Sequence, residues 1–161
     1  MKLTIFTTGG TIDKVYFDAS SEFEVGESQI AHILREAMVS FDFEVRALMQ
    51  KDSLDMTDAD RAIIRSAVEQ SDAANVLITH GTDTMTQTAS ALGGIKGKTV
   101  VLTGALSPAR FRSTDAVFNI GLAVAAVQAM PEGVYIAMNG RVFAAGHVRK
   151  NRERNRFEPT D

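Results

Sequence analysis

The chain has 161 residues, of which 45% are hydrophobic and 23% are charged, and this composition predicts one globular domain with a substantial core. It contains no cysteine, which excludes a disulfide scaffold, a thiolate metal site and a cysteine nucleophile. The 17 lysines and arginines against 20 aspartates and glutamates give a net charge of −3, so no global nucleic-acid-binding surface is expected.

Short apolar segments alternate with longer segments of helical periodicity along the chain. Thr57, followed three residues later by Asp60, is a helix-start signal. In chain order we predict a strand at 3–6, a helix at 29–39, a strand at 43–49, a helix that begins at Thr57, a strand at 76–79, a short helix that ends at 93–94, a strand at 99–103, a helix at 114–130, a strand at 134–138 and a further extended segment at 141–148.

The predicted strands lack strict alternation of apolar and polar residues, which is typical of strands with both faces covered. Buried strands that alternate with helices predict an α/β fold with a doubly wound, mostly parallel sheet in a flavodoxin-like or Rossmann-like three-layer architecture. The leading strand order is 2-1-3-4-5. In that order, ligands bind beyond the carboxyl ends of strands one and three, where the order reverses.

Two loops rich in hydroxyl groups and glycine lie at this point. Residues 7–12 read TTGGTI and residues 79–84 read THGTDT. The double glycine allows a sharp turn that presents backbone N–H groups. Thr11 and Thr82 are candidate nucleophiles, although a threonine hydroxyl needs a base to activate it. Asp83 could orient such a group and Lys150 is the available base, but the spacing leaves open whether Lys150 reaches Thr82.

Each feature also has a purely structural interpretation. A double glycine after a strand is common in tight turns and in phosphate-binding loops. Thr82 could be a helix N-cap with Asp83 in the first turn. His80 is more often a packed, hydrogen-bonded residue at a strand end than a base. With His32 and His147 it gives no metal-ligand spacing, so no metal site is expected.

Three further segments bear on partners and location. Residues 149–156 hold five basic side chains and one acid; an anion or nucleic-acid patch is one interpretation, and a solvated, partly paired segment is the one we favour in an acidic chain. The helix at 114–130 is too short and too polar to span a membrane, so it is a candidate buried or subunit-contact helix. The apolar run between Lys2 and Thr7 is too short for a signal peptide, so a cytoplasmic protein is expected.

Taken together, the two loops resemble the two signature motifs of the bacterial-type L-asparaginase family. TTGGTI at 7–12 is followed by ITHGTDTM at 78–85, and the further matches, in order, are DSLDM at 52–56, VVLTGAL at 100–106, TDAVFN at 114–119 and GHVRK at 146–150. The resemblance covers nearly the whole chain, and the sequence as a whole most resembles the short, single-domain L-asparaginases.

The resemblance implies an amidohydrolase of asparagine catabolism that converts L-asparagine to L-aspartate and ammonia without cofactor or metal. Thr11 would be the nucleophile that forms an acyl-enzyme, and Lys150 would be the base that acts through Thr82 beside Asp83. Ser53 would bind the substrate carboxylate, and Asp83 would pair with its ammonium group. The substrate-binding residues implied in this way are Gly10, Asp52, Ser53, Gly81, Thr82 and Asp83.

The sequence departs from the family pattern at three points. Leu54 stands where most members have a glutamine, and the lost hydrogen bond to a charged group costs on the order of 1.5–3 kcal/mol of binding. Tyr16, the candidate for a lid tyrosine that assists the nucleophile, lies closer to Thr11 than is usual. Typical members also have a C-terminal domain that completes a neighbouring subunit's site, so residues 1–161 correspond to a single N-terminal-type domain with that domain absent. A modest affinity and a different homo-oligomer, a dimer or tetramer with 114–130 at the contact, are expected.

Two rival functions remain open. The same chemistry could act on L-glutamine or another small amide. Alternatively, a non-catalytic α/β module could bind an amino acid or a phosphate in the same place. The joint presence of Thr11, Thr82, Asp83 and Lys150 favours an enzyme with a small-molecule substrate, because a binding module has little reason to keep all four. Which threonine acts first stays open.

Overall fold

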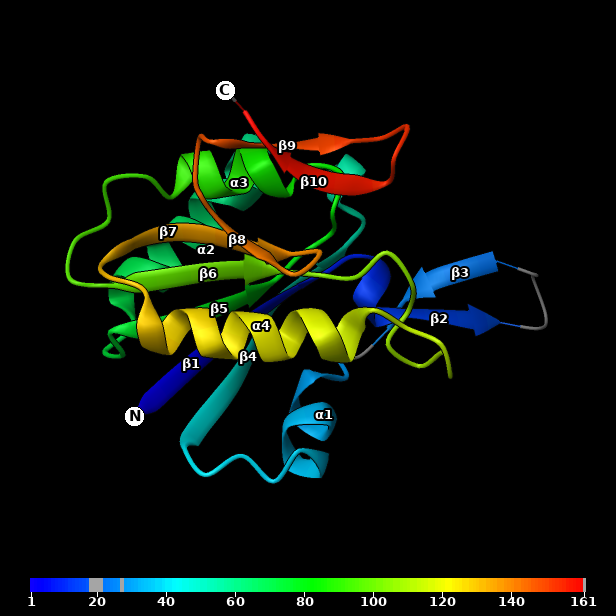
Figure 1. Cartoon of the computed structure of the whole chain (residues 1–161), viewed down its shortest axis with the longest axis horizontal. Helices are drawn as coiled ribbons and strands as arrows, with labels where there is room; N and C mark the ends of the chain where they lie inside the picture. Colours follow the sequence, from blue (N-terminus) through cyan, green and yellow to red (C-terminus); the bar gives the residue numbers. More distant parts are fainter. Residues whose placement is uncertain (18–21, 27, 161) are drawn as a thin grey trace.

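A six-stranded sheet forms the centre of the computed structural model, which describes residues 1–17, 22–26 and 28–160, with only the backbone of residues 16–17 and 22–25. The strand order is β4-β1-β5-β6-β7-β8 (Figure 1). The bounds are β1 Lys2–Gly9, β4 Asp42–Lys51, β5 Asn75–Thr79, β6 Thr99–Thr103, β7 Gly133–Met138 and β8 Arg141–Ala144. The first five strands are parallel, and β8 runs antiparallel to β7. The predicted strand order and the mostly parallel sheet are confirmed.

An apolar cluster lies on each face of the sheet, because successive side chains of a strand point to opposite faces. Val76 and Ile78 of β5 join the cluster under α2 and α3, whereas Leu77 joins the cluster under α1 and α4 (Figure 1). All three side chains are fully buried, which stabilises the fold by roughly 1.5–3 kcal/mol each. The helix bounds are α1 Ile30–Glu36, α2 Asp58–Gln70, α3 Met85–Ala91 and α4 Ala116–Ala129. The three-layer prediction is therefore confirmed.

The start of α2 follows the predicted capping signal. The Thr57 hydroxyl oxygen accepts from the Asp60 N–H at 3.2 Å, and the Asp60 carboxylate accepts from the Thr57 N–H at 2.8 Å. This reciprocal pair satisfies two backbone donors at a helix start and so fixes where the helix begins. The preceding loop therefore has a defined end.

Helix α4 is buried on one side only. Ile120 and Ala123 pack against the sheet, whereas Val117 and Phe118 are 55% and 63% exposed. The helix therefore covers the sheet and presents an apolar outer face. Among the described residues, no helix is long and apolar enough to cross a membrane.

In the part of the chain that the structure describes, two antiparallel hairpins lie outside the central sheet, and neither was predicted from the sequence. The first joins β2 (Lys14–Phe17) to β3 (Glu22–Val25), and the second joins β9 (Val148–Asn151) to β10 (Arg156–Pro159). The extended segment expected at 141–148 thus divides into β8, a turn at 145–147 and the first residue of β9.

The β9–β10 hairpin contains the basic segment. Its arginines are exposed, and Arg149, Arg154 and Arg156 lie 3.8, 3.7 and 2.8 Å from Glu158 carboxylate oxygens. These contacts agree with a solvated, partly paired segment. The regular hairpin was missed because charge dominates the sequence there. Two apolar residues, Val148 and Phe157, join the core and hold the hairpin against the body.

Candidate active site

The loops after β1 and β5 meet at the carboxyl edge of the sheet. Gly9 and Gly10 have φ values of 96° and 90°, which side chains of L residues rarely adopt. A Cβ atom on Gly10 would lie 2.4 Å from the Cα and N atoms of Gly81. Glycine is required for this close approach, and it brings the residues that follow, Thr11 and Thr82, to the same edge.

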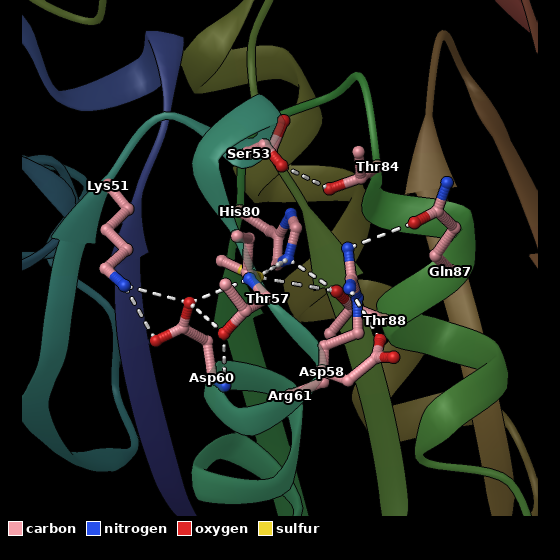
Figure 2. Close-up of polar contacts among 11 residues, drawn as sticks. Lys51, Ser53, Thr57, Asp58, Asp60, Arg61, His80, Thr84, Gln87 and Thr88 are labelled. Atoms are coloured by element: carbon pink, nitrogen blue, oxygen red, sulfur yellow. Dashed lines mark hydrogen bonds and ion pairs between the residues drawn. The ribbon is translucent and has the colours of Figure 1, made fainter.

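A third loop, residues 52–56 between β4 and α2, packs on the second one. A Cβ atom on Gly81 would lie 2.6 Å from the Cβ and Oγ atoms of Ser53. The Thr84 hydroxyl donates to the Ser53 carbonyl oxygen at 2.7 Å (Figure 2). Ser53 is 1% exposed, and within the described part of the chain its hydroxyl has no hydrogen-bond partner. Buried polar groups are normally paired, so this unpaired hydroxyl is a candidate group for contact with a ligand.

Lys150 reaches the same edge from the β9–β10 hairpin. Its Nζ atom donates to Thr82 Oγ1 at 2.7 Å and to Asp83 Oδ1 at 2.8 Å. Thr82 is 5% exposed, and the Lys150 side chain is 12% exposed. The contact that the sequence left open is therefore present. A cation, a carboxylate and a hydroxyl in such contact can pass a proton to and from a bound ligand.

Asp52 ties the 52–56 loop to the start of β2. Its Oδ1 accepts from the Leu54 N–H at 3.1 Å, and its Oδ2 lies 3.0 Å from the Lys14 Nζ. Partial burial acts to raise the pKa of Asp52, but the Leu54 N–H and the charges of Lys14 and Lys150 outweigh it and hold that pKa below its ordinary value. Asp52 is therefore a carboxylate whose charge is balanced by two lysines.

Thr11 opens η1, a short 3-10 helix over Thr11–Asp13, and is half-buried. Tyr16 lies in β2, where its backbone pairs with Phe23, and its side chain lies outside what the structure describes. Asp13, at the end of η1, is 2% exposed. Burial raises the pKa of Asp13 to about 6, against the lowering effect of the Gln29 N–H.

His80 is a core residue, as its structural interpretation predicted. Its Nδ1 lies 2.7 Å from the Gly81 carbonyl oxygen. Its Nε2 lies 2.8 Å from Thr88 Oγ1 (Figure 2). Burial lowers the pKa of His80 to about 4. The neutral ring therefore donates from Nδ1 to Gly81 and accepts at Nε2 from Thr88. In the part of the chain described, no group of three or more acidic or histidine side chains could hold a metal ion.

The interpretation of Thr82 as a helix N-cap is wrong. Helix α3 begins at Met85, and the residue at its N-cap position is Thr84. The Thr82 hydroxyl instead accepts the hydrogen bond from Lys150. Thr82 therefore makes a hydrogen bond to a residue distant in sequence, and not the N-cap bond to its own helix that the sequence suggested.

Comparison with known proteins agrees with this arrangement of loops. A family model described as "Asparaginase, N-terminal" matches residues 2–158. The chain belongs to the asparaginase family. It is 31% identical over 164 residues to the L-asparaginase of Thermococcus kodakarensis, in an alignment that covers 93% of this chain and 48% of that protein.

Solved structures of asparaginases share the fold. The thermostable L-asparaginase from Thermococcus kodakarensis superposes with a TM-score of 0.84 at 27% identity, over 99% of this chain and 51% of that one. L-asparaginase I from Vibrio cholerae gives the same score and identity, over 98% and 51%. The chain thus spans about half the length of the asparaginases it matches, and its interpretation as a single N-terminal-type domain stays a prediction.

Sequence reasoning missed two groups that join the asparaginase loops. Lys14 binds Asp52, and Thr84 binds the Ser53 carbonyl. Thr84 lies inside the ITHGTDTM motif, so its position carried a signal. Lys14 carried none, because only the turn after Thr11 brings it beside the 52–56 loop.

Proposed function

We propose that this chain hydrolyses the side-chain amide of L-asparagine to give L-aspartate and ammonia. The observation that carries the proposal is the contact of Lys150 with Thr82 and Asp83, beside the turn that bears Thr11. This is the combination of nucleophile, hydroxyl relay and charged pair that acyl transfer needs. Membership of the asparaginase family supports the same reaction.

In the proposed reaction, the Thr11 hydroxyl oxygen attacks the amide carbon and its proton passes to a base. The resulting tetrahedral oxyanion accepts hydrogen bonds from backbone N–H groups near Thr82. The C–N bond then breaks, and the nitrogen leaves as ammonia after taking up a proton, which leaves an ester on Thr11. Water attacks this acyl-enzyme, releases L-aspartate and restores the hydroxyl.

Lys150 is the proposed base, and it acts through the Thr82 hydroxyl at 2.7 Å. As a base, its amine must first lose a proton, after which a proton can pass from the nucleophile to Lys150 by way of Thr82. Asp83, at 2.8 Å from the same nitrogen, holds it in place and stabilises the cation that forms. We assign Tyr16 as an assisting phenol because it is the one tyrosine near Thr11 in the sequence, although it lies closer to Thr11 than in the family pattern.

The proposed substrate pocket uses all three loops. Ser53, with its unpartnered buried hydroxyl, binds the substrate carboxylate, and Asp83 binds the ammonium group. Backbone groups of Gly10 and Gly81 and the carboxylate of Asp52 complete the pocket. The Leu54 side chain is 63% exposed and offers no hydrogen bond, which supports the expectation of modest affinity.

L-Glutamine is the second candidate substrate. The chain is 37% identical over 92 residues to a protein named glutaminase-asparaginase from Acinetobacter glutaminasificans, over 54% of this chain and 28% of that one. The proposed chemistry is the same for both amides. They differ by one methylene, which a pocket distinguishes by only about 1–3 kcal/mol.

We also propose a homo-oligomer and a cytoplasmic location. The outer face of α4, with Val117 and Phe118 exposed, supports a contact between copies of the chain. A similar structure is described as a probable cytoplasmic L-asparaginase from Campylobacter jejuni. Sedimentation of wild type and Phe118→Asp tests the oligomer, since a monomeric wild type at working concentration contradicts it. Cell fractionation tests the location.

Ammonia release from L-asparagine and L-glutamine tests the reaction. Wild type, Thr11→Ala and Thr82→Ala are compared after circular dichroism has verified that all three are folded. We expect release from L-asparagine by wild type and a loss of at least about 10³-fold in both variants. No release from either amide ends the proposal of an amidase. Binding of L-aspartate that persists in Thr11→Ala without any turnover by wild type favours a non-catalytic module. Release that survives both substitutions refutes the assigned roles.

A further inference from the structure

Lys51, the last residue of β4, contacts the loop after β1 and the first turn of α2, and it has no part in the proposed chemistry. Its carbonyl oxygen accepts from the Gly10 N–H at 2.9 Å. Its Nζ atom lies 2.8 and 2.9 Å from the two carboxylate oxygens of Asp60 (Figure 2). Lys51 also pairs with Gly9 where the register between β1 and β4 shifts. One residue thus joins the turn before Thr11 to the start of α2.

Asp60 closes the base of the 52–56 loop. Besides Lys51, which precedes the loop, its carboxylate accepts from the N–H and the hydroxyl of Thr57, which follows the loop, at 2.8 and 2.9 Å. Asp60 is 7% exposed. Both ends of the five-residue loop are therefore bound to one buried carboxylate. The distance between these ends is fixed by side chains and not by the loop itself.

The opposite side of the loop is held by different contacts. The Thr84 hydroxyl donates to the Ser53 carbonyl oxygen, and Ser53 packs on Gly81. Because the ends of the 52–56 loop are bound to Asp60 and its outer side is bound to the loop after β5, the Ser53 hydroxyl has little freedom to move. A displacement of about 1 Å in such a group can cost up to about a hundredfold in rate.

We propose that Lys51 and Asp60 are positioning residues for the substrate-binding loop of this site. Their ion pair holds residues 52–56 in the position from which the Ser53 hydroxyl contacts the substrate. The inference rests on the proposed function, in that the loop is taken to bind the amide substrate. An ion pair with one half-exposed partner contributes little to overall stability, so its effect is expected in binding and not in folding.

The expected effect follows from which atoms each substitution removes. Lys51→Met removes the bond to Asp60 but keeps the backbone carbonyl that accepts from Gly10. We therefore expect the KM for L-asparagine to rise about tenfold while kcat changes by less than about threefold. Lys51→Arg, which can still reach the carboxylate, restores most of the affinity. Asp60→Asn resembles Lys51→Met.

Arg46→Met is the matched control. Arg46 lies in the same strand and forms an ion pair with Glu44 at 3.0 Å, away from the 52–56 loop. The Arg46→Met substitution is expected to leave KM and kcat at wild-type values. A KM within about twofold of wild type in Lys51→Met, or the same rise in Arg46→Met, overturns the proposal.

Amide hydrogen exchange separates this inference from the reaction itself. The Leu54 N–H donates to Asp52 and the Met56 N–H donates to the Ser53 carbonyl oxygen, so both report on the loop without substrate. We expect about tenfold faster exchange of both in Lys51→Met. If wild type releases no ammonia, the proposed function fails and exchange alone decides: unchanged protection refutes the positioning role.

Discussion

The Nζ atom of Lys150 lies 2.7 Å from the hydroxyl oxygen of Thr82, across 68 residues of sequence. The backbone of Lys150 pairs with Phe157 in the β9–β10 hairpin, and the Phe157 side chain is 2% exposed in the core. The position of the cation is therefore set by the packing of its hairpin. The same packing brings it to Asp83.

Lys150→Met is expected to lower kcat for L-asparagine by about 10²–10⁴-fold, because the proposed reaction loses its base. Arg149→Met is the matched control, since Arg149 precedes Lys150 in β9 and its side chain is 66% exposed. Steady-state ammonia release, with circular dichroism to verify folding, measures both. Equal activity in the two variants contradicts a catalytic role for Lys150.

Gly10→Ala is expected to destabilise the fold by about 4 kcal/mol or more and to remove activity, because the new methyl group meets the Gly81 backbone at 2.4 Å. Gly94→Ala separates this clash from backbone strain. Gly94 has a φ of 81° and open space around it, so its substitution should cost only about 1–3 kcal/mol. Urea unfolding measures both costs; similar values for the two variants contradict the close approach of the loops.

Asp13→Asn is expected to raise the free energy of unfolding, relative to wild type, more at neutral pH than at acid pH. Burial raises the pKa of Asp13 from 3.8 to about 6, so its stabilising contribution is complete below 3.8 and is lost as pH rises through about 6. The variant does not ionise and escapes this loss. Its unfolding free energy relative to wild type should rise by on the order of 3 kcal/mol between pH 4 and 7. A pH-independent difference in urea unfolding counts against a buried acid at this position.

His80→Asn is expected to show the opposite dependence on pH. Burial lowers the pKa of His80 from 6.5 to about 4, so its contribution to stability is complete above 6.5 and is lost as pH falls through about 4. The variant pays about 1–3 kcal/mol at neutral pH for the lost Thr88 contact, but this deficit should shrink on acidification. Asp13 and His80 change the stability of wild type in opposite directions as pH changes. Thermal melts of each variant against wild type, at several pH values, therefore separate the two contributions.

The arrangement of the sheet was predictable because its signals are local and periodic. Apolar runs such as 76–79 and the amphipathic helix after Thr57 each carry their own pattern. The handedness of parallel connections then leaves few strand orders. The convergence of Thr11 and Thr82 at one edge followed from that order alone.

The hairpins and the supporting contacts were not predictable in the same way. The β9–β10 hairpin is held by Val148 and Phe157, two apolar positions within a segment dominated by arginine. The bonds from Lys51 to Asp60 and from Lys14 to Asp52 depend on how loops pack in three dimensions. Such contacts join separate segments and leave no period in the sequence.

All six strands of the central sheet precede residue 145, whereas Lys150 belongs to a hairpin that follows them. On a ribosome, which adds roughly 5–20 residues per second, the sheet is synthesised in full before the lysine is. The cation that contacts Thr82 and Asp83 is therefore supplied by a segment made after every strand of the sheet. A chain interrupted after β8 would hold every strand of the sheet and still lack the amine of this cluster.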